Sequence, residues 1–157
     1  MIWESQFWKE DLANLALRLQ KRRSQRRWPE RSLAKLEKEV FIGFYAIRKL
    51  LEAKKLTEGL TKAQIPIEAF RYTGTAQITI YNWNRKVFDA YDFQKALKER
   101  VTVKFLCDQF IHSYIYKEVF DDKGGIFGLL ISSDLKRGKT LYHIPLAEVL
   151  KLFASVG

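Results

Sequence analysis

Residues 114–144, YIYKEVFDDKGGIFGLLISSDLKRGKTLYHI, decide the fold class of this chain. Apolar and β-branched side chains gather in three short segments, and the clusters between them have the Asp and Gly composition of turns. The first cluster, Asp-Asp-Lys-Gly-Gly at 121–125, is a strong hairpin signal. The pattern predicts an antiparallel meander with strands at 114–120, 126–132 and 140–144.

A helix is expected to follow this meander. Pro145 suits the first turn of a helix, because the backbone N–H that proline lacks has no helical partner there. The residues after it form an apolar stripe at helical spacing, namely Leu146, Val149, Leu150 and Phe153. We expect this final helix to cap the meander.

Two long helices are predicted near the start of the chain. Residues 3–23 carry an apolar stripe at helical steps, and a second stripe begins after Pro29 and ends near Leu56. The stretch VFIGFYAI at 40–47 is apolar almost all round, which is typical of a helix buried on more than one side. We therefore expect an antiparallel helix pair, with other elements packed over the middle of the second helix.

The chain between the helix pair and the meander has weaker patterns. A length of 157 residues fits one domain, and helices followed by strands indicate an α+β fold. In this middle part we expect irregular chain at 57–75, a short strand at 76–83 and a third helix at 92–113 that breaks or restarts at 101–103. The complete prediction is a single domain over 1–157, with a helical part at about 3–113 and a meander with its capping helix at about 114–155.

The chain is strongly basic, with a formal net charge of +10. Residues 1–57 hold 14 Lys or Arg and 7 Asp or Glu, so most of the excess lies in the first third. Such a surplus attracts polyanions, including RNA, DNA, an anionic membrane surface or an acidic partner protein. The alternative is that these charges only keep solvated helix faces soluble.

Several classes of site are not expected. A single cysteine, Cys107, excludes an intramolecular disulfide, and with two separated histidines it argues against a zinc site. The first residues do not resemble a signal peptide, and no apolar run approaches the roughly 20 residues of a membrane span. P-loop, dinucleotide-binding, nucleophile-elbow and zincin motifs do not occur. The sequence therefore predicts a cytoplasmic protein with no metal, cofactor or membrane partner.

The strongest candidate for chemistry is a set of residues four apart: Arg100, Lys104, Asp108 and His112. On one helix they would share a face. Asp108 is expected to hold one nitrogen of the His112 imidazole, so that the ring can act as a general acid or base, while Arg100 and Lys104 stabilise a phosphate. The alternative is that His112 merely caps the helix. The other histidine, His143, is expected to be a half-buried structural residue in a strand.

A basic run forms a second candidate site, for binding nucleic acid. Its arginines lie three or four apart where a continued helix would cluster them, at positions Arg22, Arg23, Arg26 and Arg27. Trp28 follows and is able to stack on a base. The alternative, which we favour for Trp28, is a core anchor beside solvated turn residues.

Arg48 is a third candidate, because it lies beside the most apolar part of the second helix. An arginine in such a place needs an acidic partner, and Asp108 is a candidate for it. The alternative is that Arg48 extends its guanidinium to solvent.

The paired long helices followed by Cys-Asp-Gln-Phe-Ile-His at 107–112 resemble the HEPN superfamily. Many of these helical domains are ribonucleases of toxin–antitoxin and other defence systems. Their motif is an arginine, a polar residue, three variable residues and a histidine, and the resemblance places the polar residue at Asp108 and the histidine at His112. Cys107 stands where the motif has its arginine. The basic residues that would take its place are Arg48, Arg100 and Lys104.

Three functions remain open. The first is a non-catalytic HEPN-like binding domain whose basic face contacts nucleic acid, with RNA favoured, or an acidic protein. The second is a metal-independent HEPN-like ribonuclease that uses His112, Asp108 and Arg48. The third is a structural or accessory subunit, or a homodimer, within a larger assembly. The missing motif arginine favours a protein that is not an enzyme. If the protein handles RNA, we expect the basic run at 21–27 and His112 to share one surface.

Overall fold

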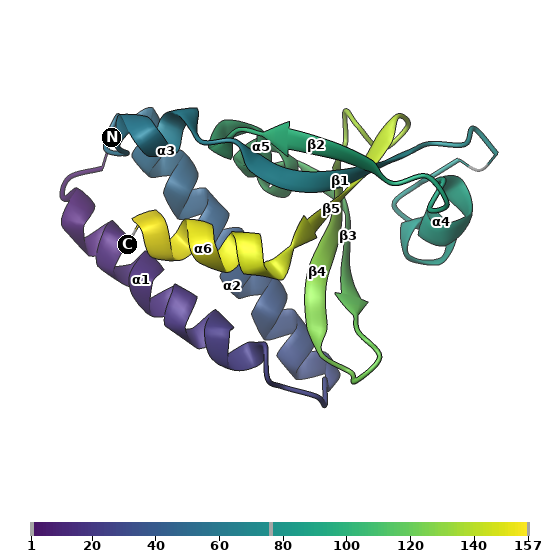
Figure 1. Ribbon diagram of the computed structural model, residues 1–157, viewed down its shortest axis with the longest axis horizontal. Coiled ribbons are helices and arrows are strands. Elements are labelled where there is room, and N and C mark those ends of the chain that lie inside the picture. The colour runs from purple at the N-terminus through teal and green to yellow at the C-terminus, as the bar shows by residue number, and fades with distance from the viewer. Residues whose placement is uncertain (1, 76, 157) are drawn as a thin grey trace.

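The computed structural model describes residues 2–75 and 77–156 and has an α+β fold, with helices on both faces of an antiparallel sheet (Figure 1). The helices of the described residues are α1 (Ser5–Arg22), α2 (Glu30–Glu52), α3 (Glu58–Lys62), α4 (Trp83–Ala90), α5 (Val103–Ile111) and α6 (Leu146–Val156). The strands are β1 (Ile65–Arg71), β2 (Leu97–Val101), β3 (Ser113–Phe120), β4 (Ile126–Ser133) and β5 (Thr140–Pro145).

The predicted meander is confirmed as β3, β4 and β5, but it is part of a larger sheet. The strand order is β2-β1-β5-β4-β3, and every neighbouring pair is antiparallel. The last strand of the meander is therefore the central strand of five. His143 of β5 lies opposite Glu68 of β1 on one side and Leu130 of β4 on the other.

The predicted helix pair is confirmed as α1 and α2, and α6 packs against both (Figure 1). Gly43 of α2 marks the close approach of the three helices. A Cβ atom at this position would overlap the ring of Phe153 on α6 and would lie 3.1 Å from Cδ2 of Leu15 on α1. The absence of a side chain at Gly43 thus allows α6 to lie against α2.

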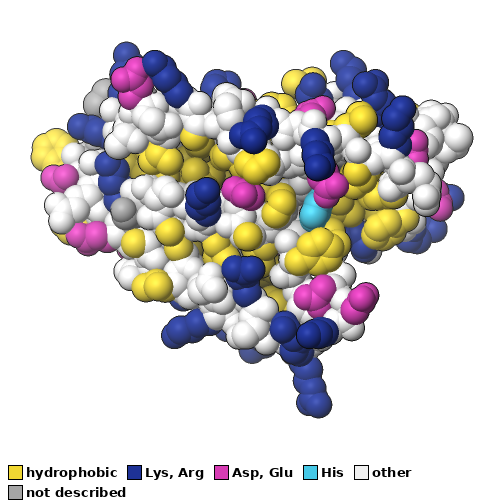
Figure 2. Space-filling model, viewed as in Figure 1, with side chains coloured by type: hydrophobic (Ala, Val, Ile, Leu, Met, Phe, Trp, Pro, Cys, Tyr) yellow, Lys and Arg dark blue, Asp and Glu magenta, His cyan; other side chains and the backbone are white. Residues whose placement is uncertain are grey.

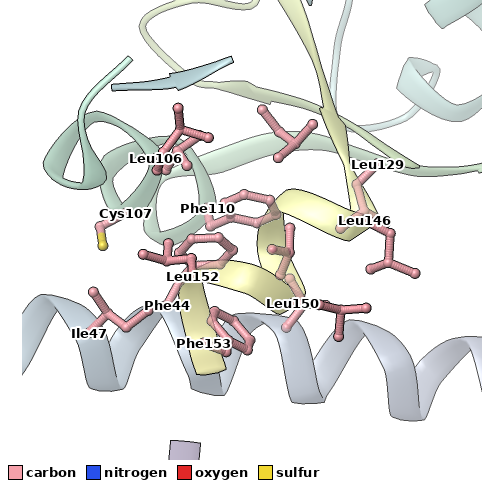
Figure 3. Close-up of a cluster of buried hydrophobic side chains, with 14 of the residues drawn as sticks. Phe44, Ile47, Leu106, Cys107, Phe110, Leu129, Leu146, Leu150, Leu152 and Phe153 are labelled. Atoms are coloured by element: carbon pink, nitrogen blue, oxygen red, sulfur yellow. The ribbon is translucent and has the colours of Figure 1, made fainter. Parts of the chain in front are cut away.

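Aromatic rings join α2, α5 and α6 in the main core (Figure 3). Phe44 of α2 stacks on Phe110 of α5 with ring centroids 4.1 Å apart and planes 7° from parallel. The Phe153 ring meets Phe44 edge-on at 5.2 Å. As expected from the apolar stretch at 40–47, the middle of α2 is covered by other elements.

The opposite face of the sheet has a smaller core. It includes Phe70 of β1, Leu130 of β4 and Leu141 of β5, which pack with Val87 and Ala90 of α4. Successive residues of a strand point to opposite faces, so Leu129 and Ile131 join the main core while Leu130 joins this one. The helix α4 covers only part of this face of the sheet.

Three predictions for the middle of the chain are wrong, the last of them only in part. Residues 57–75, expected to be irregular, contain α3 and the interior strand β1; Ile65 and Ile67 are buried while Pro66 between them is exposed. Residues 77–82 form coil and turns, because the β-branched side chains there have no neighbouring strand to pair with. The first part of the helix expected at 92–113 is instead the strand β2, whereas its expected restart at 101–103 is confirmed as α5, which begins at Val103. Thr102 begins α5 by accepting a hydrogen bond from the N–H of Phe105 at 3.1 Å.

No helix of the described residues combines the length and the apolar composition that crossing a membrane requires.

Candidate functional site

Arg48 and Asp108 form an ion pair between α2 and α5. Nη1 of Arg48 donates to Oδ1 of Asp108 at 2.5 Å, and Nε of Arg48 donates to Glu52 at 2.8 Å. Lys104, one turn before Asp108 on α5, donates to the other carboxylate oxygen at 3.0 Å. The side chains of Arg48 and Asp108 are 27% and 32% exposed, so water screens their attraction only in part. The hypothesis that Asp108 is the acidic partner of Arg48 is confirmed.

A cavity of about 640 Å³ lies beside this ion pair and is called here the Arg48 pocket. Its lining includes Arg48, Lys104, Asp108 and His112, together with the turn that follows β4. The back of the pocket is fixed by Gln109, whose side-chain oxygen accepts a hydrogen bond from the N–H of Ser133 at 3.1 Å. The structure therefore brings together the three residues predicted to be catalytic. It also adds Gln109, which no sequence motif indicated.

His112 lies at the rim of the Arg48 pocket but does not contact Asp108 as predicted. Its backbone N–H donates to the carbonyl of Asp108 at 3.1 Å, and its carbonyl accepts from the N–H of Asp134 at 3.0 Å. Within the described residues the imidazole itself has no hydrogen bond or ion pair. The reason is that α5 ends at Ile111, so His112 leaves the helical face that a spacing of four residues assumes. The backbone role of His112 at the end of α5 agrees with the structural alternative.

Arg100 is also placed differently from the prediction. It belongs to the edge strand β2, opposite Pro66, and not to the helix that carries Lys104. Arg100 does not line the Arg48 pocket. The predicted row of four charged residues on one helix is therefore wrong, because β2 and α5 divide it.

Cys107, at the position of the HEPN motif arginine, faces the core. It is fully buried, and burial raises the pKa of its thiol to about 12. The thiol is consequently uncharged at neutral pH and is neither a nucleophile nor a substitute for a guanidinium. The part of the chain predicted to be helical, about 3–113, also includes the strands β1 and β2.

The basic run predicted at 21–27 is part of a larger charged region, residues 21–38, which is called here the basic corner. It holds eight Lys or Arg and two Asp or Glu, a net of +6 out of the chain's +10. All but one of the eight basic side chains are exposed. Figure 2 shows dark blue side chains projecting from the lower edge of the molecule, where Figure 1 places the connection between α1 and α2.

Two arginines of the basic corner have structural roles. Arg22 donates to the carboxylate of Glu39 at 2.5 Å, and both side chains are more than four-fifths buried. Arg26 packs on the β3–β4 turn, where its carbonyl oxygen would lie 2.9 Å from a Cβ at Gly124. Gly124 has φ +84°, which favours glycine. Trp28 is half-buried against the main core, as the favoured alternative for it predicted.

The basic run at 21–27 and the Arg48 pocket lie near opposite ends of α2. The corner includes the start of α2 at Glu30, while Arg48 lies near the other end of that helix. At 1.5 Å per residue the two positions are separated by about 27 Å. The positive charge and His112 therefore need separate explanations.

A second cavity, of about 740 Å³, was not predicted from the sequence. It lies on the sheet face that α4 covers only in part, and its lining includes Glu68, Lys117 and His143. His143 is 8% exposed and its Nδ1 lies 3.0 Å from the carboxylate of Glu68. The alternation of residues along β4 and β5 carries the signal for this cavity, but only after the strand order is known.

The described residues contain no group of three or more His, Cys, Asp or Glu side chains placed to hold a metal ion. The comparisons with known proteins give no relative. No protein-family model matches the chain, and neither a curated protein nor a solved structure matches it significantly. The function is therefore inferred from the arrangement of the protein's own residues.

Proposed function

We propose that the protein binds nucleic acid through the basic corner and does not cleave it. The observation that carries this proposal is the net charge of +6 within residues 21–38, on side chains that are nearly all exposed. Clustered Lys and Arg release counterions when they neutralise phosphates, and this release supplies much of the affinity for nucleic acid.

The charges of the basic corner are free to meet a polyanion. Arg23, Arg27 and Arg31 are exposed, and no hydrogen bond or ion pair of their guanidinium groups occurs within the described residues. Arg23 and Arg27 lie on the short connection between α1 and α2, and Arg31 lies in the first turn of α2. The connection is held at both ends, by the Arg22–Glu39 ion pair and by the packing of Trp28. A basic surface on a rigid frame loses little conformational entropy on binding.

The Arg48 pocket supports binding less well, because its charges already neutralise one another. Asp108 accepts hydrogen bonds from both Arg48 and Lys104. A carboxylate occupied in this way does not orient His112, and general acid–base catalysis needs an oriented group within hydrogen-bond reach. For this reason we favour a non-catalytic role.

The test is binding of fluorescently labelled RNA and DNA, measured by anisotropy over a range of salt concentrations. The variant Arg23→Gln/Arg27→Gln/Arg31→Gln removes three charges from the basic corner. If each contacts one phosphate, the slope of log K against log salt becomes shallower by about 2 for a single strand. The matched control, Lys54→Gln/Lys55→Gln/Lys151→Gln, removes the same charge from exposed positions elsewhere.

The control variant is expected to bind with nearly the wild-type slope. Equal losses in the two triple variants would mean that only net charge matters, and the basic corner would not be a site. If the wild-type protein bound no nucleic acid even at low salt, the proposal would fail. An acidic protein partner, or a place in a larger assembly, would then be the better explanation of the charge.

A ribonuclease is the second candidate function, favoured by one observation: Arg48, Asp108 and His112 line the same cavity. Incubation of labelled RNA with the protein, without added metal, tests it. Cleavage that persists through purification and is lost in His112→Ala would establish the enzyme. Intact RNA across a range of pH would leave binding as the function.

A further inference from the structure

The cavity of about 740 Å³ is a groove floored by a row of residues across the sheet. Glu68, His143, Leu130 and Lys117 are register partners on β1, β5, β4 and β3. Three strand spacings separate the ends of this row, which makes the floor about 14 Å wide. A carboxylate therefore stands at one side of the groove and an ammonium at the other. We call this cavity the aromatic groove, after the five phenylalanine rings that line it: Phe70, Phe88, Phe93, Phe120 and Phe127.

The rings of the aromatic groove come from both sides of the floor. Phe88 of α4 packs on Phe93 with centroids 5.5 Å apart, and Phe93 packs on Phe70 at 4.8 Å. Phe127 of β4 stands edge-on to His143 at 5.5 Å. Phe88 and Phe127 are nevertheless 55% and 47% exposed. Figure 2 shows exposed hydrophobic side chains in the region between the β3–β4 hairpin and α4.

The aromatic groove reaches the basic corner. Leu33, which belongs to the basic corner, lines the groove, and so does Phe120 at the end of β3. The turn that follows Phe120 lies against Arg26 of the corner. Phosphate-binding charge and exposed aromatic rings are thus continuous on one side of the molecule.

We infer that the aromatic groove takes the unpaired bases of single-stranded nucleic acid whose phosphates lie on the basic corner. This inference rests on the function proposed above and specifies its substrate class. Bases stack on exposed aromatic side chains, while a duplex keeps its base faces covered by neighbouring pairs. Glu68, Glu118 and Asn84 are among the groove residues whose polar groups can meet base edges, and Lys117 can meet a phosphate or a base carbonyl.

A hydrophobic protein segment is the competing occupant, and the charges weigh against it. Lys117 lies 5.7 Å from the centroid of the Phe88 ring and donates to Asn84 at 2.9 Å, which places a cation among the rings. The groove also holds two carboxylates, Glu68 and Glu118, so the attraction for phosphates comes from Lys117 and from the neighbouring region of net +6. Exposed aromatic rings beside such a region are complementary to a polyanion with flat bases.

The experiment compares single-stranded RNA, single-stranded DNA and duplex RNA of equal length in the anisotropy assay. Phe88→Leu/Phe127→Leu removes two stacking surfaces and keeps exposed apolar side chains at both positions. We expect single strands to bind more tightly than the duplex. We also expect the double variant to lose about tenfold or more in affinity for single strands, with an unchanged salt slope. The control Phe7→Leu/Tyr45→Leu alters two exposed rings outside the groove and is expected to bind as the wild type does.

The outcomes separate this inference from the proposed function. If the Phe88/Phe127 variant kept wild-type affinity while the arginine variant lost it, the basic corner would stand and the groove would be refuted. Tighter binding of the duplex would refute the groove as well. If an apolar peptide competed with RNA for the wild type but not for the variant, and the variant kept its RNA affinity, the groove would be a protein-docking site. Wild-type affinity in the single variant Phe127→Tyr would support stacking, because tyrosine keeps the aromatic face that leucine lacks.

Discussion

Replacing Gly43 with alanine sets two opposing effects against each other at the junction of α1, α2 and α6. Alanine in place of glycine within a helix stabilises it by about 1 kcal/mol, because glycine has the greater conformational freedom when unfolded. The added Cβ, however, would overlap the Phe153 ring and press on Leu15. Overpacking of a core costs about 1–3 kcal/mol.

The Phe153 ring has little room to move away from an added Cβ atom, so we expect Gly43→Ala to lower the free energy of unfolding. It is fully buried and lies edge-on to Phe44, which is itself stacked on Phe110. Displacing Phe153 would disturb both contacts, so we take the upper end of the overpacking range. The net loss for Gly43→Ala is then about 2 kcal/mol, which lowers the midpoint of thermal unfolding by about 4–8 °C for a chain of this length.

Urea unfolding followed by circular dichroism measures the change. Gly59→Ala is a matched control, because Gly59 is also helical and has nothing within 4 Å of its Cβ position. We expect this control to be stabilised by up to about 1 kcal/mol. Adding Phe153→Leu to Gly43→Ala should relieve the overlap, giving a favourable coupling of at least about 0.5 kcal/mol in a double-mutant cycle. A Gly43→Ala protein as stable as the control would show that the junction is not close-packed and would refute the reasoning.

Three further predictions concern charges and the start of α5. Burial raises the pKa of the Glu118 carboxyl group, so the stability that this group contributes at low pH is lost as pH rises through its folded pKa. Glu118→Gln should therefore be more stable than the wild type at neutral pH, and urea unfolding should show this difference shrinking toward pH about 4. Asp108→Asn should cost about 1–2 kcal/mol, because it removes one of the two carboxylates that pair with the half-buried Arg48, the other being Glu52. Arg48→Met should relieve much of that cost in a double-mutant cycle. Thr102→Ala should cost about 1 kcal/mol in thermal unfolding, since the N–H of Phe105 loses its capping oxygen, and Thr102→Ser should restore it.

Periodicity was sufficient to predict the elements that bury one continuous stripe. The stripes of α1, α2 and α6 repeat at helical steps, and the turn at 121–125 separates two clearly apolar strands. These elements could be predicted because each one carries its own signal in a short window.

The interior strand β1 was not predicted, because Pro66 interrupts an apolar alternation that Ile65, Ile67 and Ala69 otherwise show. Proline is tolerated where its missing N–H needs no ladder partner. The edge strand β2, with the sequence LKERV, has too few apolar residues to be distinguished from a polar helix. Both strands depend on contacts distant in sequence.

The candidate site also has a part that the sequence predicts and a part that depends on contacts distant in sequence. The Arg48–Asp108 pair follows from a physical need, since a cation beside an apolar helix face requires an acid. The predicted Asp108–His112 contact failed because it depended on where a helix ends, and that boundary is the least certain feature of any local pattern. The aromatic groove brings together residues of six different elements, so no single window of sequence contains it.

The central position of β5 in the sheet has a consequence for the order of folding. Until residues 140–145 are synthesised, β1 with β2 and β3 with β4 are two separate hairpin-like pairs, each with an unpaired edge. The same short segment continues into α6, which packs against α1 and α2. Because β5 joins the two pairs last and over long sequence separations, folding is slow and the strand edges stay open to other chains in the meantime. We therefore expect the newly synthesised protein to need chaperones, or a low protein concentration, to fold without aggregating, more than its modest size would suggest.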